Sequence, residues 1–179
     1  MLSIIASMGE NREIGVGKEL AFKGRGELPY VKETTMGRKL LMGRATYESL
    51  PKRLVGREYF VLDFEAFLAP EWVNVVTDLA EFVKAAKYGG EIDVVRAGEP
   101  GKAVLAASEE IFVFGGASLY RQTLADCDKL YLTEVQAKNE EADVFFPELD
   151  ERLYSREEVG RGEYDDGTEF VRYIYTKRK

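Results

Sequence analysis

The chain has 179 residues, of which 45% are apolar and 32% charged, so we expect a single globular domain with enough length to bury a substantial core. Its formal net charge of −7 argues against general nucleic-acid binding, because that affinity comes largely from a basic surface that neutralises phosphates. The absence of histidine and the presence of one cysteine exclude Ser-His-Asp and Cys-His nucleophiles, the common zinc sites and an internal disulfide, and we predict no metal site.

The first third of the chain alternates apolar runs with short helical patterns. Residues 9–26 contain five glycines and no sustained periodicity, which indicates a long mobile loop of the kind that is often functional. Strands are predicted at 2–6, 39–43 and 59–62, and helices at 28–35 and 44–50. This alternation is typical of an α/β domain with a parallel sheet and helices on both faces.

The rest of the chain is less regular at first. Residues 64–110 match no simple unit as a whole, and we interpret them as an insertion or an irregular excursion. Within and after this segment the predicted elements are a strand at 73–76, a helix at 78–87 capped by Asp78, a possible strand at 92–95, a strand at 111–114, a helix to about 125 and a strand at 129–135. Residues 153–159 and 169–176 predict an antiparallel hairpin.

Nothing in the sequence predicts contact with a membrane. No apolar run has the length of a membrane span, and the first residues lack the basic start and the length of a signal peptide. We therefore expect a cytoplasmic protein.

Two glycine turns follow predicted strands and open predicted helices. Gly115 and Gly116 form one of them, and Gly43 forms the other, just before Arg44 and Thr46. Backbone N–H groups at such a turn can bind phosphate, and an arginine adds a guanidinium fork, so the pair of turns suits a dinucleotide. Taken singly, each turn can equally serve geometry alone, with Arg44 in solvent.

Glu27 is the acid with the most suggestive setting. It follows the glycine-rich loop and precedes Leu28 and Val31, so the chain could carry its carboxylate inward, and a buried carboxylate usually has a function. Arg57, which follows Gly56, is compatible both with a turn that exposes an arginine and with a clamp for a carboxylate.

A series of short motifs resembles the dihydrofolate reductase family in order and spacing. The resemblance covers residues 2–63 and resumes from 111 to the end, whereas 64–110 is longer than in the family's minimal form. It implies one domain over residues 1–179, with a mixed, mostly parallel sheet, helices on both faces and a C-terminal antiparallel hairpin. The motifs are Ile4-Ile-Ala, Ile14-Gly15, Glu27-Leu28, Met42-Gly43-Arg44, Thr46-Tyr-Glu-Ser49, Leu54-Val-Gly-Arg57, Phe114-Gly-Gly116, Leu119-Tyr120, Leu130-Tyr-Leu-Thr133 and Ala142-Asp-Val-Phe-Phe-Pro147.

This resemblance implies NADPH-dependent reduction of 7,8-dihydrofolate to 5,6,7,8-tetrahydrofolate, with hydride reaching pterin C6 and a proton reaching N5. The implied catalytic residues are Glu27, which binds the pterin, Thr133, which supports Glu27, and Phe22 in the mobile loop. Asp143 matches an acid that latches that loop. The implied substrate-binding residues are Ile5, Leu28, Val31, Leu50, Leu54, Arg57 and Phe114. The implied cofactor-binding residues are Ser7, Ile14, Gly43, Arg44, Ala45, Thr46, Leu62, Asp63, Gly115, Gly116, Ala117, Ser118, Leu119 and Tyr120.

Some positions depart from the family pattern. Phe22 replaces a usual tryptophan, Val31 is smaller than the usual phenylalanine, and Ser118 replaces a frequent arginine. Asp63 lies where relatives place a small hydroxyl residue near the 2′-phosphate of the cofactor. A carboxylate there disfavours the phosphate and could instead accept a hydrogen bond from a free ribose hydroxyl, so NADH is possible as a cofactor.

Two other functions stay open. One is a reductase of the same fold with another substrate, such as the pyrimidine reductases of riboflavin synthesis. The other is a nucleotide-binding or structural protein that has lost catalysis. The combination of Glu27, Thr133 and Arg57 argues against both, because neither function needs a pterin-binding acid and a clamp for a glutamate tail. As partners we expect a small-molecule substrate, dihydrofolate, without nucleic acid or membrane, and we expect a monomer.

Overall fold

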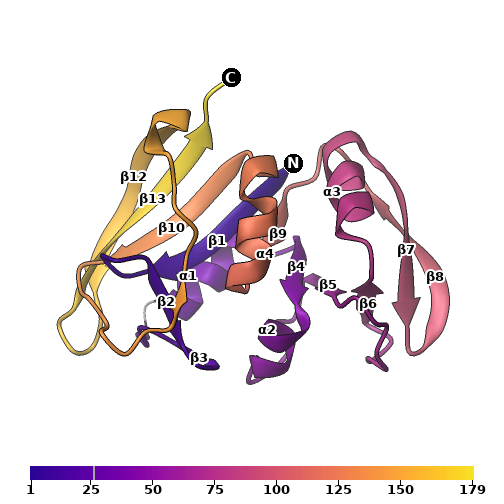
Figure 1. Cartoon of the computed structure of the whole chain (residues 1–179), viewed down its shortest axis with the longest axis horizontal. Coiled ribbons are helices and arrows are strands. Elements are labelled where there is room, and N and C mark those ends of the chain that lie inside the picture. Colours follow the sequence, from indigo (N-terminus) through magenta and orange to yellow (C-terminus); the bar gives the residue numbers. More distant parts are fainter. Residues whose placement is uncertain (26) are drawn as a thin grey trace.

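In the computed structural model, which describes residues 1–25 and 27–179, ten strands form one sheet (Figure 1). These strands are β1 (Leu2–Met8), β4 (Lys39–Gly43), β5 (Glu58–Leu62), β6 (Val73–Val76), β7 (Gly90–Arg96), β8 (Glu99–Leu105), β9 (Ile111–Val113), β10 (Lys129–Val135), β12 (Tyr154–Glu163) and β13 (Glu169–Lys177). Their order is β12-β13-β10-β1-β9-β4-β5-β6-β7-β8. The pairs from β10 to β6 are parallel and the pairs at both margins are antiparallel, which confirms the predicted mixed sheet and C-terminal hairpin.

Helices cover both faces of this sheet because both faces are apolar. Neighbouring residues of a strand point to opposite sides. Ile4 and Ile5, for example, belong to different apolar clusters. The cluster beneath α3 (Leu79–Tyr88) and α4 (Ala117–Thr123) includes Ile4, Leu41, Phe60, Phe82 and Leu119. The cluster beneath α1 (Glu27–Thr34) and α2 (Arg44–Ser49) includes Ile5, Leu40, Tyr59, Val31 and Tyr47.

Local sequence signals set the ends of α3. Asp78 is its N-cap and accepts a hydrogen bond from the Glu81 backbone N–H at 2.9 Å. Gly89 follows the last turn with a φ of 77°, a value that glycine adopts without steric cost. The helix therefore begins where the sequence predicts.

The segment at residues 9–25 is not the unstructured loop that its glycines predict. β2 (Glu13–Val16) pairs with β3 (Glu19–Leu20) and with β11 (Val144–Phe145) in a second, smaller sheet. Strands this short show no periodicity in the sequence, and Gly17, at a φ of 57°, makes the turn between the first two.

Residues 64–110 contain an added hairpin that lengthens the sheet. β7 pairs with β6, and β8 pairs with β7 at the outer edge (Figure 1). Ile92, Val94, Ala103 and Leu105 alternate along the two strands and are buried in the cluster beneath α3 and α4. The apolar face of the hairpin therefore completes the core at this margin.

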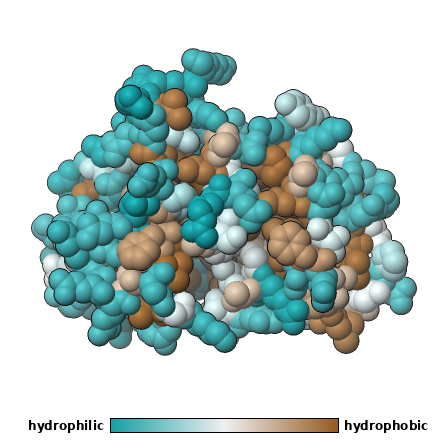
Figure 2. Space-filling model, viewed as in Figure 1, coloured by the Kyte–Doolittle hydropathy of each residue, from teal (hydrophilic) through white to brown (hydrophobic). Residues whose placement is uncertain are grey.

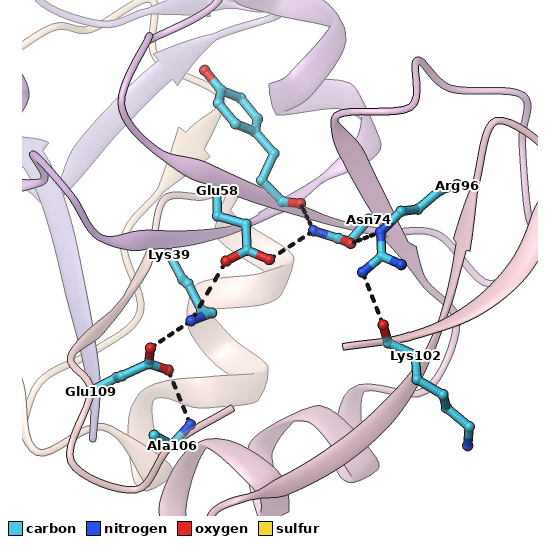
Figure 3. A network of polar contacts seen from close by, with 8 residues as sticks. Lys39, Glu58, Asn74, Arg96, Lys102, Ala106 and Glu109 are labelled. Carbon is cyan, nitrogen blue, oxygen red and sulfur yellow. Dashed lines mark hydrogen bonds and ion pairs between the residues drawn. The ribbon is translucent and has the colours of Figure 1, made fainter. Parts of the chain in front are cut away.

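A polar network fastens the hairpin to the parallel strands (Figure 3). Arg96 of β7 donates to Asn74 Oδ1 of β6 at 2.6 Å, and Asn74 donates to Glu58 Oε1 of β5 at 3.3 Å. Lys39 of β4 then pairs with Glu58 at 3.5 Å and with Glu109, just before β9, at 2.6 Å. Charged contacts therefore link consecutive strands from β4 to β7.

The face shown in Figure 2 is largely hydrophilic, and its apolar side chains appear in separate patches between polar ones. Exposed apolar side chains of the molecule include Phe64 and Leu68 before β6 and Tyr88 at the end of α3. Across the part of the chain that the structure describes, no helix combines the length and apolar character needed to cross a membrane.

Candidate active site

The predicted site residues gather where neighbouring parallel strands end. β9 lies between β1 and β4 in the sheet. Ile5 and Ser7 belong to β1, Gly43 ends β4, and Gly115 and Gly116 follow β9. Ligands of open α/β sheets bind at this edge, outside the carboxyl ends of the strands.

Glu27 begins α1 and turns its carboxylate toward the sheet. Only 17% of its side chain is exposed. The hydroxyl of Thr133, a buried residue of β10, donates to Glu27 Oε1 at 2.9 Å. The structure therefore brings together the acid and the threonine that the family resemblance pairs, although they lie 106 positions apart.

Two further groups contact the same carboxylate, and sequence reasoning missed both. The Tyr164 hydroxyl donates to Glu27 Oε2 at 3.3 Å, and Arg172 Nη2 lies 3.6 Å from that oxygen. Tyr164 follows β12 and Arg172 belongs to β13. The sequence predicts both β10 and β13, but only their register, in which Arg172 lies directly opposite Thr133, brings Arg172 to this carboxylate.

Most of the predicted substrate-binding residues share one apolar cluster beneath α1, the helix that Glu27 begins, and we call these residues the apolar wall. Among the predicted substrate-binding residues, Leu28 stands apart, with 47% of its surface exposed. The hydroxyl of Tyr59 accepts a hydrogen bond from the Leu54 backbone N–H at 2.7 Å and so fixes one side of the wall. The predicted residues that share one cluster are Ile5, Val31, Leu50, Leu54 and Phe114.

Arg57 is buried, with 7% of its surface exposed, so the alternative of a solvated arginine is wrong. Its Nε donates to the Thr35 hydroxyl at 3.2 Å, and its Nη1 donates to the Val55 carbonyl at 2.6 Å. Its Nη2 donates to the Lys32 carbonyl at the end of α1. A guanidinium has five N–H donors, so these contacts orient the fork and leave it able to bind a carboxylate.

The two predicted glycine turns form one surface. The Gly43 backbone N–H donates to the Gly115 carbonyl at 2.8 Å, and the Gly115–Gly116 peptide bond is cis. A Cβ at Gly115 or Gly116 would lie 3.5 Å from the Thr46 hydroxyl, and a Cβ at Gly43 would face both glycines of the second turn at 3.9 Å. Side chains would fill this space, so the residues present fit the pyrophosphate of a dinucleotide.

Arg44 already has acidic partners. Its Nη1 contacts Asp63 Oδ2 at 3.0 Å, and its Nε contacts Glu48 Oε1 at 2.8 Å. The hydrogen bond from Arg44 lowers the pKa of Asp63 below the usual aspartate value. The guanidinium also lies over the Phe67 ring, 4.5 Å from its centroid. The positive charge that a 2′-phosphate would need is therefore compensated by two carboxylates.

The other predicted cofactor residues divide by burial. The side chains of Leu62, Leu119 and Tyr120 are buried, and the Tyr120 hydroxyl donates to the Ile5 carbonyl at 2.9 Å, so a cofactor can reach mainly their backbone. Ala45 is exposed at the start of α2. The remaining members are Ser7 in β1, Ile14 in β2, and Ala117 and Ser118 in the first turn of α4.

The glycine-rich segment before Glu27 is tied to the C-terminal half of the chain. Asp143 Oδ1 accepts a hydrogen bond from the Gly17 backbone N–H at 2.7 Å, between the strands β2 and β3. Phe22 packs with Tyr164 and Phe170 in a third apolar cluster. The loop therefore lies against the group that surrounds Glu27.

A model of the family described as dihydrofolate reductase matches residues 1–178. The chain belongs to the dihydrofolate reductase family. The dihydrofolate reductase of Bacillus subtilis (strain 168) is 31% identical over an alignment of 179 positions, which covers 97% of this chain and 94% of that protein. The dihydrofolate reductase of Neisseria gonorrhoeae is 32% identical over 157 residues, which cover 87% of this chain and 84% of that protein.

A solved structure supports the same assignment. Dihydrofolate reductase from Enterococcus faecalis, complexed with NADP(H) and RAB-propyl, superposes with a TM-score of 0.76 at 25% identity and covers 100% of this chain and 97% of that one. The protein is therefore a dihydrofolate reductase enzyme, an oxidoreductase that uses a nicotinamide cofactor. This assignment favours dihydrofolate reduction over the two alternatives that the sequence left open.

Proposed function

We propose that this enzyme reduces 7,8-dihydrofolate to 5,6,7,8-tetrahydrofolate with NADPH, and that Glu27 is the acid that binds the pterin. The observation that carries the proposal is the largely buried Glu27 carboxylate, which Thr133 orients at 2.9 Å beside an apolar wall. The overall reaction adds a hydride to pterin C6 and a proton to N5. Bound NADPH supplies the hydride.

Glu27 suits the flat edge of a pterin. Its two oxygens can accept parallel N–H bonds from N3 and from the 2-amino group, which fixes the ring in one orientation. Thr133 restrains the rotation of the carboxylate. The chain has no histidine, so the proton for N5 comes through water. Binding of the pterin edge by Glu27 promotes the protonation of N5.

The rest of the substrate follows the apolar wall toward Arg57. The cluster of Ile5, Val31, Leu50, Leu54 and Phe114 offers contacts for the pterin and benzoyl rings. The oriented fork of Arg57 then binds the α-carboxylate of the glutamate. The loop that contains Phe22 closes over the nicotinamide and excludes water.

The glycine surface holds the other end of the cofactor. Gly43, Thr46, Gly115 and Gly116 would contact the pyrophosphate. Because Asp63 and Glu48 already pair with Arg44, a 2′-phosphate must compete with carboxylates for this guanidinium. We therefore expect NADH to serve beside NADPH.

The direct test is the initial rate of cofactor oxidation by the purified protein with dihydrofolate, measured side by side with NADPH and with NADH. The proposal requires oxidation with NADPH. A folded protein that binds cofactor but oxidises neither one would contradict it.

Replacing Glu27 by glutamine tests the acid itself. The Glu27→Gln variant should fold and bind NADPH, yet lose turnover at pH 7 by about two orders of magnitude or more, with relative recovery at low pH where the substrate is already protonated. The measurement is the steady-state rate from pH 5 to 8. Glu33→Gln, an exposed acid on the same helix, is the matched control. Undiminished activity of Glu27→Gln at pH 7 would remove Glu27 from the mechanism.

A further inference from the structure

Among the residues that the structure describes, three side chains contact the Glu27 carboxylate, and two of them contact the same oxygen. Thr133 donates to Oε1 at 2.9 Å, whereas the Tyr164 hydroxyl, at 3.3 Å, and Arg172 Nη2, at 3.6 Å, both face Oε2. The side chain of Arg172 is as well shielded as that of Glu27, with exposures of 16% and 17%. A carboxylate that binds an uncharged ring edge thus has a full positive charge beside it.

Arg172 is held in place by two aromatic rings. Its guanidinium carbon lies 4.2 Å from the centroid of the Tyr30 ring and 4.4 Å from that of Phe170. Tyr30 belongs to α1, the helix that Glu27 begins, and Phe170 belongs to the same strand as Arg172. Such cation–π contacts are strongest where the cation is shielded from water, so the guanidinium is fixed in direction as well as in position.

Tyr164 packs over the chain just before Glu27. A Cβ at Gly24 would fall 1.9 Å from the Tyr164 ring, so only glycine allows this contact. The ring also packs against Phe170, with centroids 4.9 Å apart. Burial above all, together with the nearby Glu27 carboxylate, raises the pKa of Tyr164 to about 12, so the phenol keeps its proton and acts as a donor.

We propose that Arg172 and Tyr164 are positioning residues of the reductase reaction, which hold Oε2 of Glu27 and give the pterin-binding site no net charge. The proposal rests on the function proposed above, because it assigns these residues to the acid that binds the pterin. In this chain the Tyr164 phenol and the Arg172 guanidinium flank the Glu27 carboxylate. Phe22, which packs with Tyr164, provides no hydrogen-bond donor.

The arrangement has a consequence for ligand choice. A lone carboxylate attracts a protonated heterocycle more strongly than a neutral one, because charge adds to hydrogen bonding. Here the Arg172 charge opposes that gain, since a second cation bound to Glu27 would lie close to the guanidinium. At about 5 Å and the dielectric of a protein surface, this repulsion lowers the affinity for a cation roughly tenfold or more. The site should therefore favour a neutral 2-amino-4-oxo edge.

Two pteridines of nearly the same shape test this consequence without turnover. Pterin presents a neutral 2-amino-4-oxo edge, and 2,4-diaminopteridine binds a carboxylate best after it takes up a proton. Calorimetry at pH 7 in buffers of different ionisation enthalpy gives both the affinity and the number of protons taken up. For the parent protein we expect little proton uptake with 2,4-diaminopteridine.

Removing the positive charge of Arg172 should raise both the relative affinity for 2,4-diaminopteridine and the proton uptake on binding. For Arg172→Met we expect roughly a tenfold gain in affinity for 2,4-diaminopteridine relative to pterin, together with the uptake of close to one proton. Arg172→Lys keeps the positive charge and should behave like the parent. Arg161→Met, which removes an exposed arginine of the same hairpin, should also behave like the parent. An unchanged ratio and unchanged proton uptake in Arg172→Met would overturn the role of Arg172.

The phenol is tested separately. Tyr164→Phe keeps the ring that packs over Gly24 and removes the donor to Glu27, so its melting temperature should stay close to that of the parent while its affinity for pterin falls about tenfold. Unchanged affinity for pterin would mean that Tyr164 serves packing alone.

These outcomes are distinct from a failure of the proposed function. If Glu27→Gln binds pterin and turns over like the parent, the acid is misassigned and both proposals fail. If Glu27→Gln loses both properties while Arg172→Met and Tyr164→Phe behave like the parent, only the positioning roles are wrong.

Discussion

Asp63 and Arg44 form a charged pair at the proposed adenosine end of the cofactor site. Their contact at 3.0 Å keeps the Asp63 carboxylate directed at the guanidinium, and Glu48 holds the other side of the fork. A 2′-phosphate that approaches Arg44 therefore meets negative charge as well as positive charge. A free ribose hydroxyl meets acceptors that suit it.

Replacing Asp63 by serine should raise the preference for NADPH. Without the carboxylate, Arg44 can offer its fork to the 2′-phosphate and one repulsive charge is gone, so the ratio of kcat/KM for NADPH to that for NADH should rise about tenfold to a hundredfold. Steady-state kinetics with both cofactors measure this ratio. Glu65→Ser removes an exposed acid two positions away and is the control. If both variants keep the parent ratio, Asp63 does not govern cofactor choice.

Replacing Arg57 by leucine should affect the substrate and leave the cofactor alone. Loss of a bidentate contact to the glutamate α-carboxylate should raise the KM for dihydrofolate by about two to three orders of magnitude. Arg57 also donates to Thr35 and to two backbone carbonyls, so a structural effect must be separated from a binding effect.

A dihydropterin without the glutamate tail makes that separation. It cannot use the clamp, so Arg57→Leu and the parent should reduce it with the same KM if Arg57 acts on the tail alone. The dissociation constant for NADPH should also be unchanged. An unchanged KM for dihydrofolate itself would refute the clamp.

At the scale of elements, the small sheet β11-β2-β3 connects the segment before Glu27 to the C-terminal half. The Asp143 side chain adds the contact to the Gly17 N–H at 2.7 Å. This hydrogen bond is exposed, and it adds to the pairing of β2 with β11 and to the hydrogen bond from Asn139 to the Ala21 carbonyl.

Asp143→Ala should loosen that loop. Loss of one hydrogen bond of about 1 kcal/mol lowers the fraction of closed loop about fivefold if closure is limiting, and the affinity for NADPH falls by a similar factor. Titration of cofactor fluorescence measures the affinity. Asp143→Asn keeps an acceptor oxygen and should retain most of the parent affinity. Equal affinity in Asp143→Ala and the parent would show that the contact does not hold the loop.

The sequence predicted those helices and strands that depend on residues close together in the chain. β4, β6 and the start of α3 depend on local apolar runs and on the Asp78 cap, and their predicted starts agree with the structure. β2 and β3 could not be predicted, because these strands of 4 and 2 residues lack an apolar run, and β2 pairs with β11 from far along the chain. Of the hairpin β7–β8, the sequence indicated only a possible strand at 92–95. Its turn and its second strand have no counterpart in the family motifs.

The same limit applies to the candidate site. The family motifs place Glu27 and Thr133, whereas Tyr164 and Arg172 reach Glu27 only through the fold of the C-terminal hairpin. No local pattern marks either residue. The register of β10 with β13, in which Thr133 lies opposite Arg172, is the step that sequence alone could not supply.

Across the whole molecule, acidic residues tie distant elements together. The hydrogen bond from Lys39 lowers the pKa of Glu109, and the Ala106 backbone N–H adds to this effect. Through Lys39 and Glu58 the same group joins the network that reaches the added hairpin (Figure 3). Arg44 lowers the pKa of Asp63 in the same way.

The sign of the pH dependence follows from these shifts. A carboxyl group whose pKa is lower in the folded than in the unfolded chain stabilises the fold fully above its unfolded pKa, and that contribution is lost as pH falls through the folded pKa. The melting temperature should therefore be nearly constant from pH 8 to about 5. It should fall on further acidification, as the pH drops below the ordinary glutamate pKa of about 4.3.

Glu109→Gln tests whether the network carries part of this dependence. The amide cannot pair with Lys39 as a charge, so the variant should melt at a lower temperature than the parent at pH 7. The difference should shrink as the pH falls toward 3, because the parent carboxyl is then progressively protonated. Thermal melts followed by circular dichroism at pH 7, 5, 4 and 3 measure both effects. Glu157→Gln, an exposed acid on β12, should follow the parent at every pH. If Glu109→Gln and the parent differ by the same amount at pH 7 and pH 3, the difference is not due to the charge of Glu109, and the network stabilises the fold through packing and neutral hydrogen bonds.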